Sequence, residues 1–272
     1  MKKIISCLTI MFICYNLVFQ VSAIAPDNDI TIAEKIKYDI SEGLILDENI
    51  SQEEQLAIIS NSNILSDEQK AQAVDKINFM NRISLQDIQS SVNSTLGQYN
   101  CTVAIPYFKK KNYYYCGPAT TKQSLHYING YSPSQDVIAN ALGTTTAGTD
   151  GDRIVVYMNE NQSKIYYMAV PPYSVTSMAT MIYNGLTNYK TAPILRLAME
   201  EYQGWRYSSQ GHFMNASGLY SEGYSTNGAL EYEVTDPYIE YRDNTEPDGK
   251  YRINAVAVYD STYNHFAQKF YY

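Results

Sequence analysis

The charge and the tyrosine content of the sequence change near residue 100. This change restricts the possible folds of the chain more than any other feature of the sequence. Residues 24–100 carry 13 acidic and 5 basic side chains, a net charge of −8, and few tyrosines. Residues 101–272 carry 15 acidic and 13 basic side chains, a net charge of −2, and hold most of the 27 tyrosines. The stretch 90–99 is polar and without periodicity, which is typical of a linker. We therefore place a boundary between two regions there.

Helix-start signals dominate the region 24–100. Ser51 with Glu54, and Ser66 with Gln69, both fit a capping box, in which the two side chains satisfy free N–H groups of the first helical turn. After Ser66, apolar residues recur at helical spacing. The region is predicted to be helical.

The region 101–272 alternates helix signals with short runs rich in Val, Ile and Tyr, residues that favour half-buried strands. Helices first and strands later predict an α+β fold with an antiparallel sheet. The expected helices are 117–128, 134–142 and 174–183, and the expected strands are 102–105, 192–197, 212–219, 230–234 and 251–259.

The first 23 residues have the three parts of a secretory signal. The start is basic, residues 4–18 are apolar, and Ala23 offers a small-residue cleavage site, with Ala25 as a second option. The apolar part is shorter than the ~20 residues that span a bilayer, and an uncleaved N-terminal anchor is the alternative. We expect residues 1–23 to be a signal peptide and the protein to be secreted, without stable membrane insertion afterwards.

Charge and motif content exclude several classes of function. A net charge of −8 and a pI near 4.9 argue against a nucleic-acid partner, because phosphate binding needs a basic face. Beyond the signal only Cys101 and Cys116 remain, and with three histidines they give no zinc spacing. No glycine-rich phosphate loop with a lysine occurs, and residues 150–152 are expected to form a solvated turn. We expect neither a metal nor a cofactor.

Cys116 is the candidate nucleophile. Pro118 suits the first turn of a helix, where its missing N–H costs nothing, so Cys116 is predicted at a helix N-terminus, which lowers a thiol pKa. Gly117 is expected to leave room for a substrate. The alternatives are a buried structural cysteine or one half of a disulfide with Cys101.

Three histidines are candidates for the base that a thiol nucleophile needs. His126 lies ten residues beyond Cys116 in the same predicted helix, about 15 Å along its axis, which is out of reach. His265 has no orienting neighbour in the sequence and is expected at the surface. His212 begins an alternating strand, from which its ring can point into a cleft. A structural histidine is the alternative.

Asp236 is the candidate to orient that base. It follows the predicted strand 230–234, and a Gly/Ser-rich turn joins this strand to the one that begins at His212. The two are expected to pair as a hairpin, which brings His212 and Asp236 to the same end. The carboxylate would then hold the imidazole tautomer. An ordinary Asp-Pro turn is the alternative.

Four short motifs follow one another in the second region. They are Tyr115-Cys116-Gly117-Pro118-Ala119, Gly148-Thr149-Asp150, Gly211-His212-Phe213 and Val234-Thr235-Asp236-Pro237-Tyr238. In this order they resemble the C39-like cysteine peptidases of the papain-like superfamily, over about residues 102–272. The resemblance implies a papain-like cysteine peptidase fold, in which a Cys-bearing helix packs on an antiparallel sheet that carries the His and the Asp. Here a helical N-terminal segment precedes it.

The resemblance also implies an activity, the hydrolysis of peptide bonds in a peptide or protein substrate. Cys116 would be the nucleophile, His212 the base and acid, and Asp236 the orienting group. The chain looks most like the free-standing secreted members. Residues 24–100 would be either a removable prosegment or an accessory region that stays attached.

One departure from the family concerns the oxyanion hole. The family usually places a Gln about six residues before the Cys, where this sequence has Lys110. Lys110 can still donate a hydrogen bond, and Asn112 can do so after a shift of the loop. Losing such a donor typically costs ~10²–10³ in rate. The alternative function is therefore a weak or inactive exported peptide-binding protein on the same fold.

Overall fold

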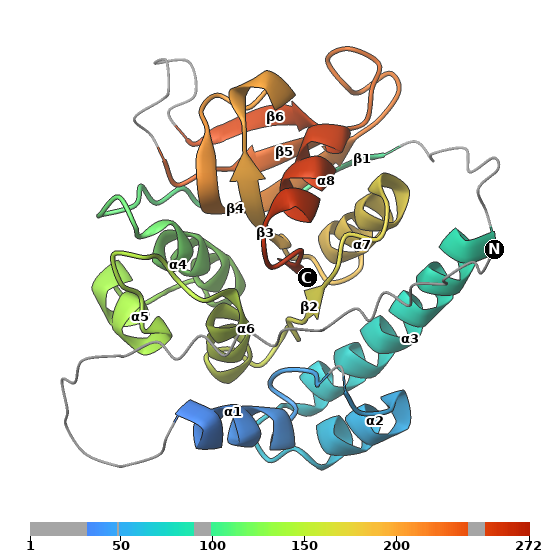
Figure 1. Cartoon of the computed structure of the whole chain (residues 1–272), viewed down its shortest axis with the longest axis vertical. Helices are drawn as coiled ribbons and strands as arrows, with labels where there is room; N and C mark the ends of the chain where they lie inside the picture. The colour runs from blue at the N-terminus through green and yellow to red at the C-terminus, as the bar shows by residue number, and fades with distance from the viewer. Residues whose placement is uncertain (1–31, 48, 90–98, 239–247) are drawn as a thin grey trace, which may run out of the picture.

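A computed structural model describes residues 32–47, 49–89, 99–238 and 248–272 (Figure 1). The predicted signal peptide, residues 1–23, lies outside these residues, as does most of the predicted linker. Within the described part of the chain, no helix has the length and apolar character needed to cross a membrane.

The N-terminal region forms three helices: α1 (Ile32–Ser41), α2 (Gln52–Asn61) and α3 (Asp67–Gln89). Both predicted capping boxes are present. The Ser51 hydroxyl accepts from the Glu54 N–H at 3.2 Å, and the Ser66 hydroxyl accepts from the Gln69 N–H at 3.1 Å. These caps fix where α2 and α3 begin, because they satisfy N–H groups that have no acceptor within the helix.

The remaining chain is α+β, as predicted. In the described residues its strands form one seven-stranded sheet of order β2-β7-β3-β4-β5-β6, with β1 paired to β4, and every pair is antiparallel. The helices are α4 (Cys116–Asn129), α5 (Gln135–Leu142), α6 (Gly151–Glu160), α7 (Val175–Thr187) and α8 (Ala255–Asn264), with a short 3-10 helix at Glu201–Gln203. The strands are β1 (Asn100–Thr102), β2 (Ala169–Val170), β3 (Ile194–Met199), β4 (Ser209–Tyr220), β5 (Glu231–Thr235), β6 (Lys250–Asn254) and β7 (Phe270–Tyr271).

Two segments differ from the sequence expectation for local reasons. The expected strand 251–259 ends at Asn254, whose side chain accepts from the Val256 N–H at 2.8 Å and so starts α8. The expected turn at 150–152 instead begins α6, because the Asp150 carboxylate accepts from the Asp152 N–H at 3.2 Å. In both cases the side chain of the N-cap residue fixes where a helix begins.

A buried polar network joins α4 to the central strand β4. The Thr120 hydroxyl donates to the Phe213 carbonyl at 2.9 Å, and the Ser124 hydroxyl donates to Asn215 Oδ1 at 2.8 Å. The Asn215 amide in turn donates to Gln123 Oε1 at 3.0 Å. Hydrogen bonds are directional, so they fix the position of the helix along the strand more strictly than apolar packing does.

The N-terminal helices share an apolar core with the sheet. Leu44, Ile59 and Ile77 belong to the same buried cluster as Leu195 and Met214. Each such side chain stabilises the fold by roughly 1.5–3 kcal/mol when fully buried.

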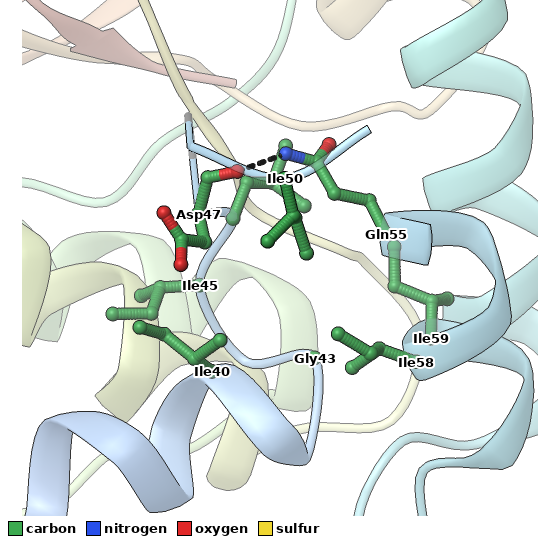
Figure 2. Close-up of a pocket in the computed structure, with 9 residues that line it drawn as sticks. Ile40, Gly43, Ile45, Asp47, Ile50, Gln55, Ile58 and Ile59 are labelled. Carbon is green, nitrogen blue, oxygen red and sulfur yellow. Dashed lines mark hydrogen bonds between the residues drawn. The ribbon is translucent and has the colours of Figure 1, made fainter. Parts of the chain in front are cut away.

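The loop between α1 and α2 encloses a small pocket lined by isoleucines, among them Ile40, Ile45 and Ile58 (Figure 2). The Gln55 side-chain amide donates to the Asp47 carbonyl across its rim. Its volume of about 10 Å³ has room for about one water molecule, so this pocket is part of the packing and is too small for a ligand.

Candidate active site

Cys116 is the first residue of α4, as the sequence predicts, and its side chain is 7% exposed. Pro118 lies in the first turn of this helix, where a missing N–H leaves no acceptor unsatisfied. Gly117 has a different role from the one expected. A Cβ there would lie 2.5 Å from Thr149 Oγ1, so Gly117 makes room for Thr149 rather than for a substrate.

His212 and Asp236 meet at one end of the sheet. Strands β4 and β5 are antiparallel, with Asn215 opposite Thr235, so His212 near the start of β4 and Asp236 just past β5 come together. His212 Nε2 lies 2.9 Å from Asp236 Oδ1, and both side chains are at most 3% exposed. The Cys116 thiol and the His212 ring line the same cleft, and each shifts the pKa of the other. His212 therefore lies between the sulfur and the carboxylate.

The electrostatics favour a charged pair. Burial opposes a charge on His212, but the Asp236 carboxylate and the hydrogen bonds to Asp236 and Cys116 outweigh it and raise the pKa of His212 to about 9. Burial also opposes the thiolate, yet His212, the Phe213 N–H and the Lys110 charge together lower the pKa of Cys116. The two groups titrate as a coupled pair. Both shifts favour the form of the pair in which a thiolate lies beside an imidazolium.

The carboxylate itself is held by four donors. Besides His212, the Tyr238 N–H donates to Asp236 Oδ1 at 2.8 Å. The hydroxyls of Tyr207 and Tyr251 donate to Asp236 Oδ2 at 2.8 and 3.1 Å. Burial works against ionisation, but His212, the Tyr238 N–H and the Tyr207 hydroxyl lower the pKa of Asp236. The carboxylate thus remains an anion although it is only 1% exposed.

A cleft of about 230 Å³ opens onto the sulfur and the imidazole. All the residues that line it lie between 110 and 238, and no described residue of α1, α2 or α3 is among them. They are Lys110, Tyr113, Cys116, Tyr207, Ser208, Ser209, Gly211, His212 and Tyr238. The cleft brings a polar, aromatic wall beside the thiol, which suits a peptide backbone with its alternating polar groups.

Lys110 enters this cleft and Asn112 does not. The Lys110 ammonium donates to the Tyr113 carbonyl at 2.9 Å and lies 3.6 Å from the centre of the Tyr238 ring. The Lys110 N–H donates to the Pro237 carbonyl at 2.9 Å, which ties its backbone to the residue after Asp236. Asn112 is absent from the residues that line the cleft, and its carbonyl accepts from the Tyr115 N–H.

The other histidines lie apart from the thiol. His126 packs edge-on against Phe108, with 5.2 Å between ring centres. His265 is 2% exposed, so its expected place at the surface is wrong. Its Nδ1 accepts from the Ala267 N–H at 3.1 Å, and burial together with the Arg196 charge lowers the pKa of His265 to about 4. Its ring is a neutral acceptor in a turn.

Cys101 and Cys116 are both free thiols. Cys101 lies on β1 opposite Leu219, whereas Cys116 shares a cleft with His212 at the other end of β4. Seven residues of strand separate these points, which is about 20 Å, and a disulfide requires Cα atoms within about 7 Å. The two cysteines therefore do not pair in this fold.

Tyr207 and Tyr251 are site residues that the sequence did not single out. Tyr207 lies in the loop before β4, and Tyr251 lies on β6 opposite Val234. In a chain with 27 tyrosines, neither position stands out from residue type alone. Within the described residues, no group of three or more His, Cys, Asp or Glu side chains is placed to hold a metal ion.

No protein-family model and no curated protein matches the chain. Among solved structures it is similar to a double-glycine-motif protease from an AMS/PCAT transporter in complex with the leader peptide, at 13% identity and a TM-score of 0.37 over 64% of this chain and 96% of that one. It is also similar to the peptidase domain of Streptococcus ComA, a bi-functional ABC transporter, at 15% identity and a TM-score of 0.39 over 62% and 97%.

A third similar structure is a recombinant stem bromelain precursor, at 12% identity and a TM-score of 0.41 over 88% of this chain and 97% of that one. The functional conclusion therefore depends on the geometry around Cys116.

Proposed function

We propose that the protein is a cysteine peptidase that hydrolyses peptide bonds through Cys116, His212 and Asp236. The observation that carries the proposal is the position of His212, which shares a cleft with the Cys116 thiol and is hydrogen-bonded to the buried Asp236 carboxylate. A nucleophile, a base in contact with it and a group that orients the base are the three parts that covalent catalysis needs.

In the proposed reaction the Cys116 thiolate attacks the carbonyl carbon of the scissile bond. The His212 imidazolium gives its proton to the leaving amine as the C–N bond breaks, which leaves a thioester on Cys116. A water molecule then loses a proton to His212 and attacks the thioester, releasing the acid and restoring the thiolate–imidazolium pair. Asp236 stays ionised throughout and stabilises the charge on His212.

The oxyanion formed in each step needs hydrogen-bond donors. The Cys116 N–H belongs to the first turn of α4, whose N–H groups have no acceptor within the helix. Lys110 is the proposed second donor, in place of the Gln of the resembled family. Lys110 lines the cleft, and the positive charge of its ammonium lowers the pKa of the Cys116 thiol. A cation aimed at developing negative charge is an effective form of transition-state stabilisation.

A thiol-directed peptide probe tests the proposal. The protein and its Cys116→Ala variant are incubated with the probe and with a fluorogenic peptide library, and Cys101→Ala is the control because it removes the other free thiol. Labelling and turnover are expected in the protein and in Cys101→Ala, and neither in Cys116→Ala. Turnover that survives in Cys116→Ala would reject the peptidase assignment. Labelling without turnover of any peptide would favour the binding-protein alternative.

The N-terminal helices are proposed to be an accessory part that stays attached. The Gln69 amide lies within hydrogen-bond distance of one carbonyl at the end of α6, that of Asn159 at 3.0 Å, and of two in the loop that follows, those of Gln162 at 3.0 Å and Ile165 at 3.2 Å. The Lys76 ammonium donates to the Tyr166 carbonyl at 2.6 Å. Losing the helices would remove these donors and expose the apolar residues of the sheet that share a buried cluster with the helices.

Export through residues 1–23 is likewise proposed, on the sequence pattern. Sequencing the N-terminus of the active protein from the medium tests both proposals at once. A start at Ile24 or Pro26 fits export with retained helices. A start near residue 100 would instead identify a removable prosegment.

A further inference from the structure

The Asp236 carboxylate has an unusual set of partners for a buried anion. Its two oxygens each accept two hydrogen bonds: Oδ1 from His212 and the Tyr238 N–H, and Oδ2 from the hydroxyls of Tyr207 and Tyr251. A carboxylate offers about four acceptor positions, so all of them are used. The donors come from four places in the chain: the loop before β4, strand β4, the residues after β5, and strand β6.

We infer that Tyr207 and Tyr251 are positioning residues for the triad, an inference that rests on the proposed function. With Oδ2 held by two hydroxyls, the carboxylate cannot turn about its Cβ–Cγ bond without losing both. Oδ1 is thereby kept facing His212 Nε2. This fixes the ring so that its other nitrogen serves the Cys116 thiol, the geometry on which proton transfer depends.

The chemistry of the two donors matters as much as their position. A lysine or arginine at Oδ2 would neutralise Asp236 and compete with His212 for its charge. A phenol donates a hydrogen bond and carries no charge, so the full negative charge remains available to His212. Burial and the Asp236 charge raise the pKa of Tyr207 far above its usual value, so this hydroxyl keeps its proton at any working pH.

Tyr207 and Tyr251 differ in what else they touch. The Tyr207 ring lies edge-on to His212 and to Tyr238, with 5.7 and 5.0 Å between centres, and it lines the cleft. Tyr251 is 6% exposed, does not line the cleft, and has the Arg206 guanidinium over its ring at 4.6 Å. A change at Tyr251 therefore reports on Asp236 without altering the surface that a substrate meets.

Phenylalanine substitutions test the inference, because each removes one hydroxyl and keeps the ring. Tyr251→Phe is expected to lower kcat about tenfold with KM unchanged, and Tyr207→Phe with Tyr251→Phe about 10²-fold. In an Asp236→Ala background the same substitutions should have no further effect. Tyr232→Phe is the matched control, since Tyr232 is a fully buried tyrosine of the same sheet whose hydroxyl has no hydrogen-bond partner among the described residues. Thermal denaturation checks that each variant folds.

A second readout does not need peptidase activity. The rate of Cys116 alkylation by iodoacetamide is measured against pH for the same variants. The profile of the double phenylalanine variant should move toward that of Asp236→Ala, while Tyr232→Phe keeps the original profile. The inference is overturned if Tyr251→Phe behaves like Tyr232→Phe, or if it lowers kcat equally with and without Asp236. Turnover that persists in Cys116→Ala would reject the peptidase proposal. The alkylation profiles would then still decide whether Tyr207 and Tyr251 position Asp236.

Discussion

His212 Nε2 and Asp236 Oδ1 lie 2.9 Å apart, in a contact almost wholly shielded from water. Removing the carboxylate charge with Asp236→Asn should lower the pKa of His212 from about 9. His212 is then protonated over a narrower range, so the loss of activity on the alkaline side begins at lower pH. The measurement is kcat/KM from pH 5 to 10. Asp248→Asn, an acidic residue with no contact to His212, should keep the original profile.

The same contact makes stability depend on pH. The folded state raises the pKa of His212 from 6.5 to about 9, so it binds this proton more tightly than the unfolded chain does. The contribution of His212 to the free energy of unfolding is complete below about pH 6.5, and it is lost as the pH rises through 9. Urea unfolding at pH 6, 8 and 10 is expected to show it. In His212→Gln the fall in unfolding free energy between pH 6 and 10 should be smaller, because this group is gone. A fall of equal size in that variant would show that His212 does not cause it.

Lys110 has a charge role and a donor role that substitutions separate. Lys110→Met should lower kcat by ~10²–10³ with KM little changed, because the proposed oxyanion donor is lost. Lys110→Gln keeps a donor and should lose much less. Both variants should raise the pKa of Cys116, since both remove the charge that lowers it.

The neighbouring Lys109 is the control for these variants, because it is exposed and does not line the cleft. Lys109→Met should leave kcat and the alkylation profile of Cys116 unchanged. A rise in KM alone in Lys110→Met would assign the lysine to substrate binding instead of catalysis.

Gly117 is expected to tolerate no side chain. In Gly117→Ala the new Cβ would lie 2.5 Å from Thr149 Oγ1 and 2.7 Å from Thr149 Cβ, so the start of α4 must move and carry Cys116 with it. A displacement near 1 Å can cost about 10²-fold in rate. Adding Thr149→Gly removes the clash and should restore much of the activity, measured as kcat/KM. Failure of this rescue would show that Gly117 is required for another reason.

Lys76 should be needed to keep the N-terminal helices docked. It is fully buried, and its ammonium lies 4.5 and 4.6 Å from the ring centres of Tyr189 and Tyr272. Lys76→Ala leaves the Tyr166 carbonyl without this donor and opens a cavity, so we expect a loss of about 3 kcal/mol or more in unfolding free energy. Lys70→Ala, on the same helix but half-buried, should cost far less. Limited proteolysis should cleave α3 faster in Lys76→Ala only.

Short-range patterns in the sequence predict part of this architecture. The Ser51 and Ser66 capping boxes, the helix at Cys116 and the antiparallel β4–β5 pair are found where short-range patterns predict them. The pairing of β4 with β5 follows from the Gly/Ser-rich connection 221–230 between them, and it accounts for the meeting of His212 with Asp236. These features depend on neighbours in sequence, so sequence alone can indicate them.

Other features depend on contacts that no local pattern encodes. Tyr251 reaches Asp236 because β6 pairs with β5, with Tyr251 opposite Val234. The burial of His265 follows from packing near Gly211 and Arg196, far away in the sequence. Both facts require the register of the sheet and the path of residues 248–272, which periodicity does not supply.

The three residues of the proposed triad come from three elements. Cys116 begins α4, His212 lies near the start of β4, and Asp236 follows the end of β5. No stretch shorter than 116–236 holds all of them, and α4 keeps its place only while β4 is formed beneath it. The proposed hydrolytic activity therefore requires the finished fold, and a nascent or partly unfolded chain would lack it. Loss of this activity on heating should coincide with loss of the sheet, as a single cooperative event.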